Sequence, residues 1–175
     1  EYKTRKIMIC PWGTTVKQID PCDIIFGHFE IQSFKFNQHK VCEEGIKSDT
    51  LLKRAPLVIT GHFHLREERK YKNGTILYVG NPYQMDFGDV YSSKGYYILD
   101  MMTGEYDFHE NNISPTHQKI KLSQIVQHES LSAEVIQIFN NNIVKLSFLK
   151  QCCRLSCSKT LFTLNIKNIS NINTS

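Results

Sequence analysis

The sequence predicts an α/β protein built in two layers around a mixed β-sheet. Its core strands are short apolar runs with little or no polar face, which is typical of strands in parallel or mixed sheets. Runs of this kind lie at residues 6–10, 23–26 and 57–59. A short helix is expected at residues 48–54, with Ser48 as its N-cap.

Further strands follow these elements along the chain. Residues 75–79 predict another sheet strand, and residues 95–99 and 105–109 predict a hairpin. The aromatic and irregular stretch at residues 31–45 is expected to form a loop over an edge of the sheet.

The chain is expected to divide into three parts. Residues 1–113 would form the C-terminal half of one domain. Residues 114–150 would begin a small α+β domain, with a helix at 131–139 and a strand at 143–148. Residues 151–175 are rich in Asn, Ser, Lys and Cys, and we predict no structure for them.

Composition describes a globular protein with no predicted membrane segment. The chain has 175 residues, of which 41% are hydrophobic, and this length suits one ordinary domain or one small domain and part of another. No apolar run approaches the roughly 18 residues that span a bilayer, and no signal-peptide pattern opens the chain. Because the sequence starts at Glu1 and enters a strand within ten residues, we interpret it as a piece of a longer protein.

Charge and cysteine content say less about function. The net charge of +4 permits a nucleic-acid partner, but no dense Lys/Arg stripe argues for one. Six cysteines lie without the spacing of a disulfide framework, so we expect reduced thiols and a cytoplasmic protein, in the host cytoplasm if it is viral. They are Cys10, Cys22, Cys42, Cys152, Cys153 and Cys157.

The most informative residues are three histidines that follow apolar strands. Gly27-His28 ends one run, and Gly61-His62-Phe63-His64 ends another. Side chains two apart in extended backbone point to the same side, so we expect His62 and His64 to face one way and Phe63 to anchor the loop in the core. Neutral imidazole is a good ligand for divalent transition ions, and the three rings predict a metal site at the rim of the sheet.

These motifs resemble the last two signatures of calcineurin-like metallophosphoesterases. The run YVGNPYQMDFGD at residues 78–89, followed by KGYYILD at 94–100, is similar to the SbcD-type DNA-repair nucleases. It is especially similar to the nuclease subunit of tailed-phage recombination endonucleases. The resemblance covers about residues 6–110 and continues weakly through 142–146. It implies an incomplete metallophosphoesterase fold, in which a mixed-sheet layer is followed by the start of a DNA-capping domain.

The resemblance also implies roles for the histidines. His28 and His62 would be ligands of the second ion of a two-metal centre, and His64 a ligand of the first. Two divalent ions are expected, most fittingly Mn²⁺, although the same ligands would suit zinc, iron or magnesium. In the family, Asp-x-His, Gly-Asp and Gly-Asn-His motifs precede these histidine motifs, and none of the three occurs upstream of His28 in this sequence. We therefore expect negligible hydrolysis by the 175-residue chain alone.

Other polar residues are candidates for supporting roles. Glu30, Asp86 and Asp89 could hydrogen-bond a ligating imidazole, or be solvated loop acids. A group of basic residues after His64 could contact the phosphate backbone of DNA, or form a solvated face that Glu67 and Glu68 dilute. These basic residues are Arg66, Arg69, Lys70 and Lys72.

Three interpretations of function stay open at this point. In the first, the chain is part of a dimetal nuclease that processes DNA ends in repair or recombination, with an SMC-like ATPase subunit (SbcC-type) and a nuclease homodimer as implied partners. In the second, it is a metallophosphatase for another substrate class. In the third, it is a non-catalytic subunit that binds DNA or the ATPase.

Overall fold

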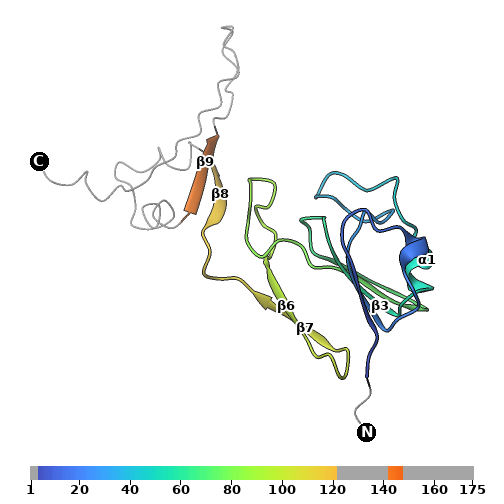
Figure 1. The fold of residues 1–175 in the computed structure, drawn as a ribbon. Helices are drawn as coiled ribbons and strands as arrows, with labels where there is room; N and C mark the ends of the chain where they lie inside the picture. Colours follow the sequence, from blue (N-terminus) through green and yellow to red (C-terminus); the bar gives the residue numbers. More distant parts are fainter. Residues whose placement is uncertain (1–3, 122–141, 148–175) are drawn as a thin grey trace, which may run out of the picture. The chain divides into compact units, whose positions relative to one another are not determined.

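The computed structural model describes residues 4–121 and 142–147 (Figure 1). The helix expected at residues 131–139 and the segment 151–175 lie outside the described residues. Within the described part, residues 4–83 and 92–112 form one compact unit. Residues 84–91, 113–121 and 142–147 belong to a second unit, and each unit is described by itself.

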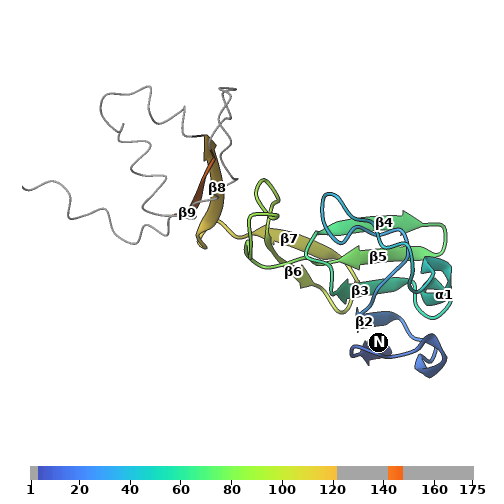
Figure 2. The same ribbon diagram turned by 90° about the horizontal axis from the view of Figure 1, so that it is seen from above.

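A five-stranded mixed sheet forms the first unit. Its strands are β1 (Ile7–Cys10), β2 (Ile24–His28), β3 (Leu57–Gly61), β4 (Glu67–Tyr71) and β5 (Gly74–Tyr78). The spatial order is β1-β2-β3-β5-β4, and Figure 2 shows β2, β3, β5 and β4 side by side. All neighbouring pairs are parallel except β4 with β5. The predicted apolar strands and the mixed sheet are confirmed.

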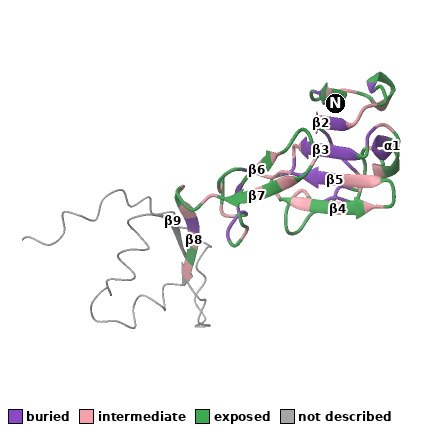
Figure 3. Ribbon diagram, turned by 90° about the horizontal axis from the view of Figure 1, so that it is seen from below, coloured by how far each residue is buried: buried purple, intermediate pink, exposed green. Residues whose placement is uncertain are grey.

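The sequence analysis missed one strand of the sheet, the edge strand β4 at residues 67–71. Its sequence, EERKY, alternates half-buried with exposed side chains. A charged edge strand buries little apolar surface, so its sequence lacks the apolar run that identifies the inner strands. Figure 3 shows the contrast, with β3 and β5 largely buried and β4 either half-buried or exposed at every residue.

One face of the sheet carries the larger core. Side chains from β2, β3 and β5 pack there against the helix α1 (Ser48–Leu52) and against loops that include the stretch after β2. A 3-10 helix, η1 (Val16–Gln18), lies between β1 and β2 in the chain. Members of this core that are at most 3% exposed include Ile25, Phe29, Phe34, Leu51, Val58, Phe63, Ile76 and Tyr78.

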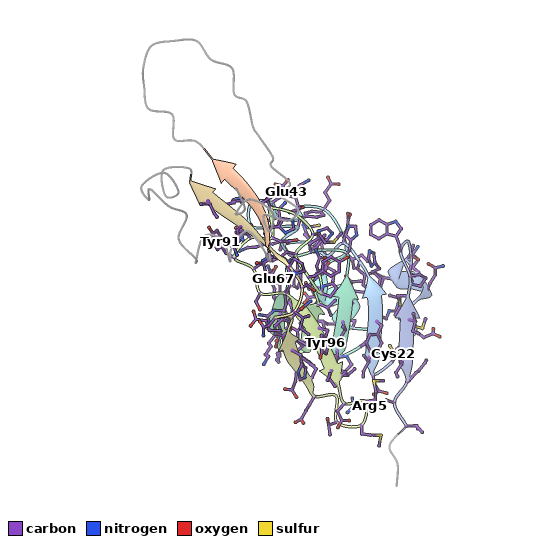
Figure 4. All side chains as sticks on the ribbon, turned by 90° about the vertical axis from the view of Figure 1, so that its left-hand side faces the viewer. Arg5, Cys22, Glu43, Glu67, Tyr91 and Tyr96 are labelled. Carbon is purple, nitrogen blue, oxygen red and sulfur yellow. The ribbon has the colours of Figure 1, made fainter. Side chains whose placement is uncertain are left out.

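The opposite face packs against the predicted hairpin, which is confirmed. Its strands are β6 (Gly95–Leu99) and β7 (Tyr106–Glu110), which pair antiparallel. Tyr97, Leu99 and Tyr106 of the hairpin pack against the apolar side chains of this face. Arg5 donates hydrogen bonds to the carbonyls of Met102 and Thr103 in the hairpin turn (Figure 4).

The start of α1 differs from the prediction. The N-cap is Lys47 in extended conformation, without a side-chain capping bond, and Ser48 is the first helical residue. The Ser48 hydroxyl instead lies 3.0 Å from the Tyr71 hydroxyl of β4. The Ser48 side chain, which the sequence assigns to the N-cap, therefore forms a hydrogen bond with a distant strand instead.

The second unit contains a parallel pair of strands, β8 (Thr116–Lys121) and β9 (Asn142–Ser147). The sequence pattern predicts β9 at residues 143–148, but the polar segment that forms β8 carries no strand signal. The ring of Phe87 packs edge-on against His117 at a centroid distance of 4.8 Å. Among the described residues, no helix is long and apolar enough to cross a membrane.

Candidate metal centre

The topology of the sheet brings two of the predicted ligands to one edge. β1, β2 and β3 are adjacent and parallel, so their carboxyl ends meet at the same edge of the sheet. His28 is the last residue of β2, His62 directly follows β3, and Trp12 follows β1. Three neighbouring strands therefore deliver two imidazoles and an indole to a common rim.

The backbone at Gly61 and His62 accommodates the two imidazoles. His28 pairs in register with Gly61, and a Cβ atom at Gly61 would lie 3.1 Å from His28 Nδ1. Glycine therefore leaves room for the His28 imidazole beside β3. His62 itself has φ +88°, a left-handed conformation that is uncommon for residues other than glycine.

The histidine network has a defined direction of hydrogen bonding. His62 Nε2 lies 3.0 Å from Glu30 Oε1, and His62 Nδ1 lies 3.3 Å from His28 Nε2. The carboxylate of Glu30 only accepts, so His62 Nε2 carries the hydrogen. In the neutral imidazole of His62, Nδ1 then presents a lone pair toward His28. A proton on His28 Nε2 can fill this space, and so can a cation between the two nitrogens.

The distance between the facing nitrogens of His28 and His62 fits a shared metal ion. Two imidazole nitrogens that ligate one tetrahedral zinc ion lie roughly 3.3 Å apart. The observed separation between His28 Nε2 and His62 Nδ1 is 3.3 Å. A ligating imidazole commonly donates its other N–H to a carboxylate, and Glu30 stands at that position on His62. The arrangement can thus supply two nitrogen ligands with one of them oriented by a carboxylate.

Buried hydrogen bonds fix the chain on both sides of Glu30. The Tyr78 hydroxyl donates to the Phe29 carbonyl at 2.7 Å and accepts from the Ile31 N–H at 3.0 Å. The Phe29 N–H donates to Thr60 Oγ1 at 3.1 Å. Burial is the main reason that the pKa of Tyr78 is raised well above its ordinary value. The neutral phenol therefore remains available to both backbone groups.

Aromatic side chains surround the His62 ring. The indole of Trp12 stacks on His62 with a centroid distance of 4.5 Å and an interplanar angle of 29°. The same indole meets the edge of His28 at 5.8 Å and 78°. The ring of Phe36 lies edge-on to His62 at 6.3 Å. Contacts on several sides therefore restrict the orientation of the His62 imidazole.

His64 does not join this pair in a three-histidine cluster. In residues 4–121, no three His, Cys, Asp or Glu side chains form a group that could hold a metal ion. The His64 side chain is exposed, while its carbonyl accepts hydrogen bonds from Lys94 Nζ at 2.7 Å and from the Asn81 N–H at 3.3 Å. The extended backbone expected across residues 61–64 is wrong, because the positive φ of His62 breaks the two-residue alternation.

The expected anchoring of the loop by Phe63 is confirmed. Phe63 is 2% exposed and its ring stacks on Tyr78 at a centroid distance of 4.6 Å. The loop that carries His62 is therefore attached to the core through the residue between the two histidines.

The predicted acidic residues fall in different places. Glu30 contacts His62, as described above. Asp86 and Asp89 belong to the second unit, where Asp86 Oδ1 accepts from the Gly88 N–H and Asp89 Oδ2 accepts from the Met85 N–H. Both carboxylates thus make local hydrogen bonds within one loop.

The basic residues after His64 are partly engaged within the protein. The Arg66 guanidinium lies 4.0 Å from the Phe108 ring centroid and donates to the Tyr97 hydroxyl at 3.3 Å. Arg69 pairs with Glu67 and donates to the Ser33 carbonyl at 2.9 Å. The remaining two are exposed: Lys70, whose ammonium lies 3.3 Å from Glu68, and Lys72 in the turn between β4 and β5.

Sequence reasoning missed three residues that shape the centre. Trp12 is the single tryptophan of the chain, and its position directly after an apolar strand is the signal that could have placed it at the rim. Tyr78 and Lys94 lie within the two runs, at residues 78–89 and 94–100, that carry the family resemblance. Their roles depend on contacts with residues 29–31 and 64, which sequence spacing does not reveal.

Comparison with known proteins relates the chain to a phage protein. Over 122 residues, 65% of this chain, the sequence is 30% identical to "Exonuclease subunit 1" of Enterobacteria phage T4. The chain spans about a third of the length of that relative, 34%. No family model matches the chain.

Proposed function

We propose that this chain is part of a metal-dependent DNA nuclease and supplies histidine ligands of its metal centre. One observation carries the proposal. His28 Nε2 and His62 Nδ1 face each other at 3.3 Å, while Glu30 fixes the hydrogen of His62 on the other ring nitrogen. The distant relation to a phage exonuclease subunit supports a nuclease rather than another metal-binding protein.

The residues of the chain would divide the work as follows. His28 and His62 would hold one divalent ion, most fittingly Mn²⁺, and Glu30 would orient the His62 ring. His64 would serve a second ion, as the family resemblance implies. Divalent ions at such a centre polarise a phosphodiester and stabilise the charge that develops on it. The mixed sheet that places these residues would be one layer of a metallophosphoesterase fold.

We further propose that the chain alone does not hydrolyse DNA. A two-metal centre needs carboxylates that bridge and hold the ions, and no three candidate ligands converge in the described residues. In the working enzyme the remaining ligands would come from polypeptide outside this sequence. Its proposed partners are DNA, an SMC-like ATPase subunit and a second nuclease subunit.

Metal titration tests whether His28 and His62 bind a divalent ion. Calorimetric titration with Mn²⁺ should show one site, and His28→Ala and His62→Ala should each weaken it by at least tenfold. Glu30→Gln should weaken it by about 10- to 100-fold, because it removes the carboxylate that accepts the His62 hydrogen. His39→Ala, a change of an exposed histidine elsewhere, is the matched control. Equal affinity in all four variants would overturn the proposal.

The phosphatase alternative is separated by substrate. In a protein that carries the remaining ligands, Mn²⁺-dependent turnover of DNA should greatly exceed turnover of p-nitrophenyl phosphate. The reverse preference would favour a phosphatase, and metal binding without turnover of either substrate would favour a non-catalytic subunit.

A further inference from the structure

Trp12 is positioned by the fold but its indole remains largely open to solvent. One face of the ring stacks on His62 at 4.5 Å, while 60% of the residue is exposed. The stacked face is covered by the imidazole, so the exposed area includes the opposite face. A large planar aromatic surface therefore lies at the same rim as the imidazoles of His28 and His62.

Hydrogen bonds and a buried neighbouring residue hold the loop that carries Trp12 in a defined conformation. It sits in the turn Pro11-Trp12-Gly13, in which Gly13 adopts φ +85°. The Pro11 carbonyl accepts from the Thr14 N–H at 3.1 Å and from the Thr14 hydroxyl at 2.7 Å. Since Cys10 just before the turn is 1% exposed, the turn starts from a fixed point of the core.

We propose that Trp12 is a stacking platform for an unpaired nucleobase of a DNA strand that is bound at the His28–His62 site. This inference rests on the proposed nuclease function and narrows its substrate to nucleotides with an unstacked base. Every base has a planar π-face, so an exposed indole binds single-stranded nucleic acid with little sequence preference. A base inside an intact duplex has no free face for this contact.

A second aromatic ring and a cation also lie near His62. Phe36 lies edge-on to the imidazole at 6.3 Å, and the Lys40 ammonium lies 5.1 Å from the Phe36 ring centroid. Aromatic surface for bases and a cation for the backbone are the two elements of sites that bind single strands. The exposed indole of Trp12 and the ammonium of Lys40 beside Phe36 therefore favour a nucleotide over a small phosphate ester without a planar group.

Fluorescence provides a site-specific test, because Trp12 is the single tryptophan. Oligothymidylate should quench the Trp12 emission of the purified protein in the presence of Mn²⁺, and fully paired duplex should quench it much less. Trp12→Ala should weaken the binding of dye-labelled oligothymidylate, measured by anisotropy, by roughly 5- to 100-fold. Trp12→Phe should retain most of the affinity, since a smaller ring still stacks.

Two controls separate this inference from its premise. Tyr91→Ala removes another exposed aromatic, from the second unit, and should leave oligothymidylate affinity within twofold. Mn²⁺ affinity of Trp12→Ala, measured by calorimetry, should stay within threefold, because Glu30 and Phe36 still contact the His62 ring. Circular dichroism should confirm that the variant is folded. Mn²⁺ binding with unchanged oligothymidylate affinity in Trp12→Ala would refute the stacking platform alone. A matching loss of both affinities would also refute it and make Trp12 a positioning residue for His62, whereas no Mn²⁺ binding by the native protein would refute the proposed function.

Discussion

Removing the Tyr78 hydroxyl should destabilise the protein and weaken Mn²⁺ binding at the proposed metal centre. The hydroxyl connects the Phe29 carbonyl and the Ile31 N–H, the two backbone groups that flank Glu30. Tyr78 and Ile31 are both 0% exposed. In Tyr78→Phe, water has no easy access to replace the lost partner, so the Ile31 N–H is left buried without a hydrogen bond.

The expected cost follows from that unsatisfied group. A buried donor without a partner costs about 1–3 kcal/mol, whereas a hydrogen bond at an exposed site contributes much less. Tyr97→Phe is the matched control, because the Tyr97 hydroxyl meets only the exposed Arg66 side chain at 3.3 Å. We therefore expect a loss of about 1–3 kcal/mol in the free energy of unfolding for Tyr78→Phe and under about 0.5 kcal/mol for Tyr97→Phe.

Urea denaturation followed by circular dichroism measures both free energies, and calorimetric titration with Mn²⁺ measures the site. Mn²⁺ affinity should fall severalfold in Tyr78→Phe, because Glu30 is then less firmly placed against His62. If the free energy of unfolding of Tyr78→Phe lies within 0.5 kcal/mol of that of the native protein, the Tyr78 hydroxyl does not stabilise the backbone at Phe29 and Ile31 as the structure indicates.

Two further predictions concern Gly61 and the change of the free energy of unfolding with pH under alkaline conditions. Gly61→Ala should lower Mn²⁺ affinity severalfold while leaving the protein folded, because the new Cβ would lie 3.1 Å from His28 Nδ1 and displace that ring; unchanged affinity in a calorimetric titration would show that the ring has room. Burial, above all, raises the pKa of Tyr106 to about 12. Between pH 10 and 12 the unfolded phenol ionises while the folded one keeps its proton, so stability should fall as pH rises. Urea denaturation across this range should show a shallower fall in Tyr106→Phe, and identical pH profiles would contradict the shift.

Most of the sheet could be predicted from sequence because its inner strands are largely buried on both faces. β2, β3 and β5 read as apolar runs, and the Gly-His pairs mark where two of them end. β4 could not be found in the same way, since an edge strand with Glu68 and Lys70 on its exposed side carries no apolar pattern. Propensity also misplaced the helix cap, because the Ser48 hydroxyl meets Tyr71 from a distant strand.

The site was predictable in part for a related reason. Parallel strands end at one edge, so a histidine after each of two neighbouring strands is enough to predict that His28 and His62 lie close together. The direction of the His64 side chain depends on the left-handed backbone at His62, which could not be predicted from the sequence. The stacking of Trp12 on His62 required the order of the strands, because the two residues are far apart in the chain.

The identity of the nitrogen ligands tests the central claim most directly. Pulsed electron paramagnetic resonance of Mn²⁺ bound to the protein should show coupling to two imidazole nitrogens. One coupling should disappear in His28→Ala and the other in His62→Ala. Mn²⁺ without imidazole coupling, or with both couplings retained after either change, would show that this rim does not bind the ion.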